Sequence, residues 1–110
     1  MEVDFEKSVN PLREKAIKIA CVGSSYGILT MCPETMEELM QMGKTHTEPA
    51  AASIWTSDGE KLDDIRYLFH VTGITNLYFL RTDQEKYAKK HGYQYLTGHL
   101  KAADLEKDNI

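Results

Sequence analysis

The sequence predicts an α/β domain with a mainly parallel sheet. The main observation is a β-α-β-α-β pattern over residues 51–97, in which an apolar run, a helix start and a closing glycine occur twice. The helix starts Ser57–Glu60 and Thr82–Glu85 have the form of capping boxes, where a hydroxyl and a glutamate satisfy backbone N–H groups reciprocally. Gly73 and Gly92 stand where a helix end favours a left-handed residue. Apolar runs that alternate with helices predict parallel strands joined by crossovers.

Before this unit the sequence predicts an antiparallel hairpin. Residues 12–22 carry two patterns: alternating β-branched residues favour a strand, and apolar residues at helical spacing from Leu12 favour a helix. We expect a strand over Ile17–Val22, and the helical alternative for this segment stays open. A turn rich in serine and glycine then returns the chain as Ile28–Cys32.

A helix is predicted over residues 33–42. Pro33 suits its first position, acidic residues fill its first turn, and Gly43 follows as a stop signal. Its outer side carries Glu34, Glu37, Glu38 and Gln41, with methionines along the flank. Acidic side chains beside adaptable methionines suit the binding of a basic partner, although methionines that face the sheet and glutamates that face solvent explain the same pattern.

The strands of the predicted sheet are 51–56, 75–81 and 93–97, with a helix over 58–72 between the first two. Leu77–Leu80 is nearly continuously apolar, which is typical of a central strand covered on both faces. Together with the N-terminal hairpin and helix, this gives a predicted α/β fold of a single domain.

Composition limits the classes of function. The chain has 110 residues, long enough for one core and without a linker, so residues 1–110 are predicted to be one domain with mobile ends at 1–9 and 106–110. Thirteen basic and seventeen acidic residues give a net charge of −4, which disfavours direct binding of nucleic acid. No apolar run approaches the roughly 20 residues needed to cross a membrane. The acidic N-terminus and the two cysteines favour a cytoplasmic protein.

Two glycine-containing segments superficially suggest nucleotide binding. The loop from Gly23 to Gly27 lacks the middle glycine of a dinucleotide fingerprint, and Pro33 leaves no room for the helix that must follow. Gly43–Thr45 resembles the end of a P-loop, but Glu38 stands where the first glycine is required. We therefore expect no cofactor.

A candidate ligand site lies at the predicted carboxyl edge of the sheet. Ser57, Asp58, Thr82 and Asp83 follow two strands predicted to be parallel neighbours, and α/β sheets bind ligands at such edges. The acidic residues disfavour a phosphate there. A hard cation between Asp58 and Asp83 would require the two helices to start side by side, and stabilisation of helix dipoles explains the same residues, so no metal site is assigned.

Cys32 is the one candidate nucleophile. It precedes a predicted helix start, a position that lowers the pKa of a thiol. The four histidines show no local pattern that would supply a base, and a buried structural cysteine is the more common explanation. No catalytic residue is assigned.

The segment from Ile74 to Thr82, continued to Gly92 and Tyr93, resembles the closing strand and helix of GNAT-type N-acetyltransferases. The resemblance implies coenzyme A binding and acyl transfer. However, residues 57–61 lack the glycine- and arginine-rich composition of that family's coenzyme A loop, and Ala88 stands at the place of its acid tyrosine, one residue from Tyr87.

Two functions follow from these patterns. The first is a small acidic soluble protein, non-enzymatic, that binds and regulates or inhibits a macromolecular partner, which we expect to be a protein. The alternative is a small-molecule-binding or transferase-like domain. A homodimer is compatible with either function.

Overall fold

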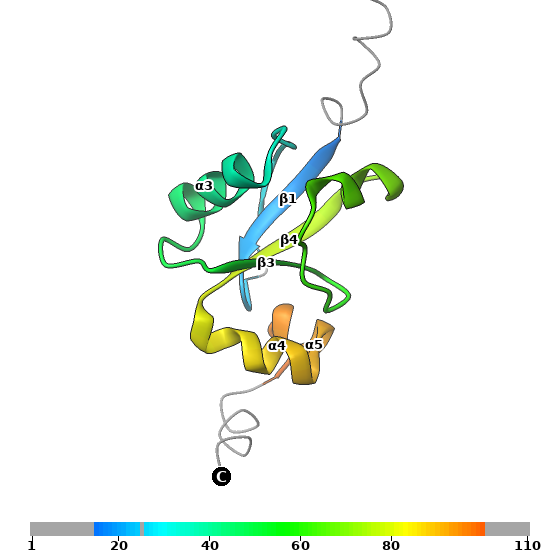
Figure 1. Cartoon of the computed structure of the whole chain (residues 1–110). Coiled ribbons are helices and arrows are strands. Elements are labelled where there is room, and N and C mark those ends of the chain that lie inside the picture. Colours follow the sequence, from blue (N-terminus) through cyan, green and yellow to red (C-terminus); the bar gives the residue numbers. More distant parts are fainter. Residues whose placement is uncertain (1–14, 25, 101–110) are drawn as a thin grey trace, which may run out of the picture.

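Four strands form one mixed sheet in the order β2-β1-β4-β3 (Figure 1). The structure is a computed structural model and describes residues 15–24 and 26–100. The central strands β1 and β4 are parallel, β2 is antiparallel to β1, and β3 is antiparallel to β4. The strands are β1 (Ala16–Cys21), β2 (Ile28–Met31), β3 (Ser53–Thr56) and β4 (Thr75–Leu80). The predicted mobile ends lie outside the described residues.

With its helices this sheet makes a single compact α/β domain, as the sequence predicts. The helices are α3 (Met36–His46), α4 (Glu85–His91) and α5 (Tyr93–Leu96), with 3-10 segments η1 (Ile65–His70) and η2 (Thr82–Gln84). The predicted N-terminal hairpin is confirmed as β1 and β2, which also resolves residues 16–21 as strand rather than helix. The prediction of a mainly parallel sheet is wrong, because two of the three strand pairs are antiparallel.

The error arises at the end of β3. Gly59 has a φ of 90° and its N–H donates to the carbonyl of Thr56 at 3.0 Å, so the predicted helix start is a tight turn. The chain then runs back beside β3, where Lys61 forms a bridge with Trp55. The predicted capping box Ser57–Glu60 and the helix over 58–72 are therefore wrong, and only η1 is helical in that region. With this turn in place of a crossover helix, the chain enters β4 antiparallel to β3.

The predicted strand 93–97 is also wrong, since Tyr93–Leu96 forms helix α5. Both edges of β4 are already paired, so a further strand beside it has no place. Tyr95 and Leu96 instead pack against the sheet. Gly73 and Gly92 have φ values of 78° and 57°, which confirms the positive φ predicted for both.

The short helical turn η2, which leads into α4, starts one residue before the predicted helix start. The amide side chain of Gln84 accepts a hydrogen bond from the backbone N–H of Arg81 at 2.8 Å, and the N–H of Gln84 donates to the Arg81 carbonyl at 3.0 Å. The reciprocal contact predicted for Thr82 and Glu85 thus involves their preceding neighbours. The helix itself and its end at Gly92 are as predicted.

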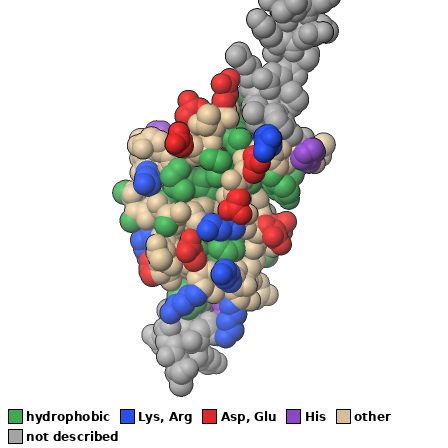
Figure 2. All heavy atoms as spheres, in the orientation of Figure 1, with side chains coloured by type: hydrophobic (Ala, Val, Ile, Leu, Met, Phe, Trp, Pro, Cys, Tyr) green, Lys and Arg blue, Asp and Glu red, His purple; other side chains and the backbone are tan. Residues whose placement is uncertain are grey.

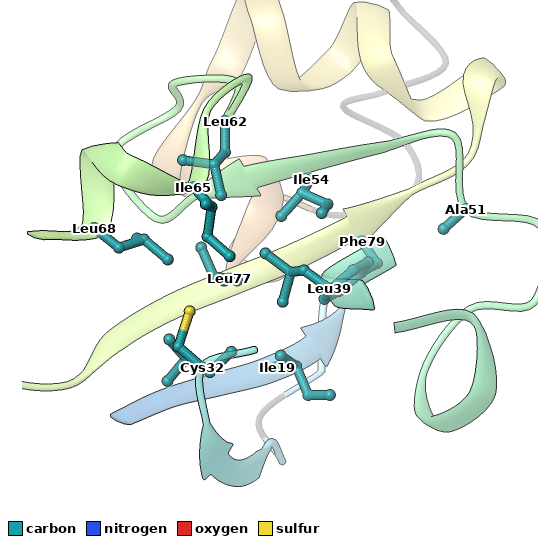
Figure 3. Close-up of a cluster of buried hydrophobic side chains, with 11 residues drawn as sticks. Ile19, Cys32, Leu39, Ala51, Ile54, Leu62, Ile65, Leu68, Leu77 and Phe79 are labelled. Carbon is teal, nitrogen blue, oxygen red and sulfur yellow. The ribbon is translucent and has the colours of Figure 1, made fainter. Parts of the chain in front are cut away.

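Two apolar clusters cover opposite faces of the sheet. Alternate residues of each strand point to opposite faces, so Leu77 and Phe79 belong to one cluster while Tyr78 and Leu80 belong to the other. The first cluster packs α3 and η1 against the sheet (Figure 3), and its buried residues are Ile17, Ile19, Cys32, Leu39, Ala51, Ile54, Leu62, Ile65, Leu68, Leu77 and Phe79. The second packs α4 and α5 against the other face, with buried residues Ala20, Trp55, Tyr78, Leu80, Ala88, Tyr95 and Leu96.

Helix α3 confirms the helix predicted over 33–42 but has different ends. Thr35 is its N-cap: the Thr35 hydroxyl accepts from the N–H of Glu38 at 3.1 Å, and the Glu38 carboxylate accepts from the N–H of Glu34 at 3.3 Å. Gly43 does not end the helix, which continues to His46. This glycine is buried and faces the ring of Phe79.

The position of this cap gives a direct stability prediction. We expect Thr35→Ala to lower the free energy of unfolding by about 0.5–2 kcal/mol, because the N–H of Glu38 loses its partner. Ser57→Ala, which the sequence pattern alone would have placed in the same class, should change stability by less than about 0.5 kcal/mol. Urea denaturation of the two variants measures this difference. Equal losses in both would contradict the observed cap.

Candidate functional site

Of the predicted ligand-site residues, Ser57 and Asp58 line a cleft beside the turn after β3. It has two compartments of about 440 and 180 Å³ that share Thr56, Asp58 and the half-exposed Tyr67. The Thr56 hydroxyl donates to the Asp58 carboxylate, which fixes the turn. Thr75 also lines the smaller compartment, and its buried hydroxyl has no hydrogen-bond partner among the described residues. The cleft therefore combines acidic, hydroxyl and aromatic groups.

Thr82 and Asp83 lie elsewhere. Because β3 and β4 are antiparallel, the turn after β3 and the start of η2 leave opposite ends of the strand pair. Arg81 binds Asp83 at 3.0 Å and Glu48 at 3.1 Å, and the Arg81 guanidinium lowers the pKa of Asp83. The geometry required for one ligand or cation between Asp58 and Asp83 is therefore absent.

The predicted partner surface on α3 is exposed. Glu34, Glu37, Glu38 and Gln41 all face solvent, while Met36, Met40 and Met42 are partly buried against the first cluster. Glu38 also completes the helix cap, and the Gln41 side chain contacts Thr45 at 3.4 Å. This arrangement agrees with the explanation in which the methionines face the sheet and the glutamates face solvent. The role of these residues in binding a partner remains a prediction.

Basic side chains gather on α4, at the lower end of the molecule in Figure 2. Lys89, Lys90 and His91 occupy its last turn, where positive charge stabilises the helix dipole. Lys86 lies over the ring of Tyr87, with its Nζ 5.0 Å from the ring centre. The last turn of α4 is therefore basic, although elsewhere acidic and basic side chains lie side by side, as Arg81 does with Asp83 and Glu48.

Cys32 is buried in the first cluster, and its thiol donates to the carbonyl of Pro33 at 3.2 Å. Burial raises the pKa of this thiol, an effect that the neighbouring Lys15 ammonium partly opposes. It lies before the N-cap Thr35 rather than at the cap. The environment is that of a structural cysteine.

We expect Cys32 to react slowly with a thiol reagent at pH 7, at least tenfold more slowly than in the unfolded chain, because the thiolate is disfavoured and covered. A Cys21→Ser variant isolates its signal. The raised pKa also means that the unfolded chain releases this proton first as the pH rises, so stability should fall through the alkaline range. Cys32→Ala should reduce that fall. Rapid reaction at pH 6 would identify Cys32 as a reactive thiol.

A further surface is formed by the part of the sheet that α4 and α5 leave uncovered. We call it the open face and define it by Lys18, Tyr26, Leu29, Met31 and Asn76. Its three apolar residues, Tyr26, Leu29 and Met31, are 78%, 59% and 49% exposed. Pairing of Lys18 with Leu29 and with Asn76 places β2, β1 and β4 side by side on this face.

A hollow of about 230 Å³ adjoins the open face. The residues that line it include Lys18, Tyr26, Asn76, Tyr78 and Thr97. Burial raises the pKa of the Tyr78 hydroxyl, which therefore stays protonated. The hollow can accept a side chain from a partner, and its rim offers both an ammonium and an amide.

Sequence reasoning missed the open face. The available signal was the alternation Ile28–Leu29–Thr30–Met31, in which only one set of side chains can face the first cluster. That pattern does not reveal whether a helix covers the other set. Whether a helix covers these side chains depends on where α5 packs, and the sequence predicts a strand over residues 93–97 instead of that helix.

Comparisons of the chain with protein-family models, curated proteins and solved structures found no match. Among the described residues, no helix combines the length and apolar character needed to cross a membrane.

Proposed function

We propose that this chain is a non-enzymatic protein-binding domain that binds and regulates or inhibits a macromolecular partner in the cytoplasm. The open face carries the proposal. Tyr26, Leu29 and Met31 are large apolar side chains exposed together next to a hollow. Tyrosine and methionine are enriched in protein interfaces, and contiguous exposed apolar groups mark interaction sites.

The chemistry of the rim supports a protein partner. Lys18 and Asn76 supply hydrogen-bond donors beside the apolar side chains, so this surface offers a partner both apolar and polar contacts. The hollow of about 230 Å³ suits one anchoring side chain of the partner. The net charge of −4 disfavours nucleic acid as that partner.

The test is quantitative recovery of partners from cell extract by three proteins. We expect Leu29→Lys with Met31→Lys to lose the specific partner at least tenfold relative to wild type, since two charges then occupy an apolar contact. Ile74→Lys is the matched control, because Ile74 is 55% exposed but lies outside the open face. All three should have the same melting temperature. Equal recovery by wild type and the double variant would reject the open face as the binding surface.

A second candidate is small-molecule binding in the cleft of Ser57 and Asp58. The unpaired, buried hydroxyl of Thr75 favours it, since a buried polar group without a partner carries a free-energy cost that a bound group can remove. A thermal-shift screen with coenzyme A, nucleotides and divalent ions tests this candidate, because a bound ligand raises the melting temperature. A shift removed by Thr75→Val would support it.

A further inference from the structure

Strand β2 forms an outer edge of the described sheet. The N–H of Cys32 donates to the carbonyl of Lys15 at 2.7 Å, so the backbone N–H of Cys32 points toward β1. This bond sets the direction in which the N–H and C=O groups of the preceding β2 residues point. Because these directions alternate along an antiparallel strand, Thr30 also faces β1. Leu29 and Met31 therefore direct their N–H and C=O groups outward. Their side chains are exposed on the open face as well.

Apart from its short length, β2 lacks the usual protections of a sheet edge. Edge strands commonly carry a charged residue, a proline or a bulge that prevents pairing with another chain. Ile28–Met31 contains no charged residue and no proline, and it pairs with β1 in an uninterrupted register. The strand is short, which limits how many hydrogen bonds an added strand can form.

We propose that β2 pairs with β2 of a second copy of this chain, antiparallel and about a two-fold axis at Thr30, so that the two sheets become one. This rests on the proposed function, because it identifies the occupant of the open face. Closed two-fold pairing uses the same surface on both copies and ends the assembly at a dimer.

The register follows from the strand itself. An axis at Thr30 places Leu29 opposite the partner's Met31, and Met31 opposite the partner's Leu29. Both pairs join residues whose N–H and C=O groups point outward, so all four outward groups of each strand find partners. An axis at Met31 would instead place Leu29 opposite the partner's Pro33, which has no N–H to donate.

The side chains fit this register. Leu29, Met31 and their two copies come together on the open face and cover one another. On the other face, Thr30 lies opposite the partner's Thr30, a favourable cross-strand pair. No two like charges are opposed within the paired strands, because β2 carries none. Each strand has only 4 residues, so the dimer buries less surface area than a standard protein interface. We therefore expect weak, concentration-dependent dimerisation.

Sedimentation velocity over a wide range of concentration tests the proposal. Wild type should change from monomer to dimer, and Leu29→Lys with Met31→Lys should raise the dissociation constant at least tenfold, since four ammonium groups then meet at the joint. Leu29→Glu with Met31→Lys changes the same two positions but places opposite charges across the proposed register. It should dimerise more tightly than the double lysine variant. Ile74→Lys should dimerise like wild type.

Three results would overturn the proposal. A wild-type monomer at every concentration excludes the dimer. Equal dissociation constants for the two double variants exclude the register, and weakening by Ile74→Lys places the joint elsewhere. The proposed function has a separate readout: a monomer that still recovers a partner through Leu29 and Met31 retains that function and rejects only the second copy as occupant. Matching melting curves at a concentration at which all the proteins are monomeric show that each variant is folded.

Discussion

Replacing Gly43 with alanine is expected to destabilise the fold by about 1–3 kcal/mol, although alanine is the better helix former. A Cβ on Gly43 would lie 2.0 Å from Cε2 of the Phe79 ring. Phe79 is fully buried in the central strand β4, so the ring cannot move away without disturbing the first cluster. Overpacking thus outweighs the gain of about 1 kcal/mol in helix propensity. Urea denaturation measures the loss, with Gln41→Ala on the exposed side of α3 as a control.

A double-mutant cycle identifies the cause. In a Phe79→Leu background the ring is absent, and Gly43→Ala should cost less than in the wild-type background. The same cost in both backgrounds would assign the role of Gly43 to something other than the contact with Phe79.

Replacing Lys15 with methionine is expected to cost about 2–3 kcal/mol. The Lys15 side chain is 8% exposed, and its ammonium donates to the carbonyls of Val71 at 2.6 Å and Gly73 at 2.7 Å. These bonds connect the start of β1 to the segment before β4. Methionine has a similar length but no donor, so both hydrogen bonds are lost. Burial lowers the pKa of the Lys15 ammonium.

Lys18→Met is the matched control, because Lys18 lies in β1, close to Lys15 in the sequence, but is exposed on the open face. It should change the free energy of unfolding by less than about 0.5 kcal/mol. Similar losses in the two variants would show that the contacts of Lys15 with the carbonyls do not stabilise the fold. Both variants are compared with wild type by urea denaturation at one pH.

The sequence predicted well the elements whose signals are local. The β1–β2 hairpin follows from alternating apolar residues around a turn, and α4 follows from a helix that ends at Gly92. The turn at Ser57–Gly59 was misread because serine, aspartate and glycine suit a helix start and a tight turn equally well. The backbone hydrogen bonds to Thr56 decide between them, and those depend on the chain's return beside β3.

The predicted ligand site depended on how this one turn was interpreted. A parallel β3 would have placed Ser57 and Thr82 at the same sheet edge, whereas the antiparallel β3 separates them. The open face could not be predicted either, since it is defined by where α4 and α5 stop covering the sheet. The local pattern identified Leu77–Leu80 of β4 as covered on both faces, but the extent of helix coverage over the sheet is a property of the complete fold.

The central parallel pair of β1 and β4 also has a consequence for how the chain folds. The β1–β2 hairpin joins residues close in sequence, but Ile17 of β1 pairs with Thr75 of β4, and that contact closes a long loop. Loop closure of this kind is slow relative to hairpin formation, because its entropy is lost before the contacts form. During synthesis β1 therefore cannot form its parallel pairing until β4 has emerged from the ribosome. Until then Ile17 and Ile19 have no parallel neighbour, and the nascent hairpin exposes both of its edges.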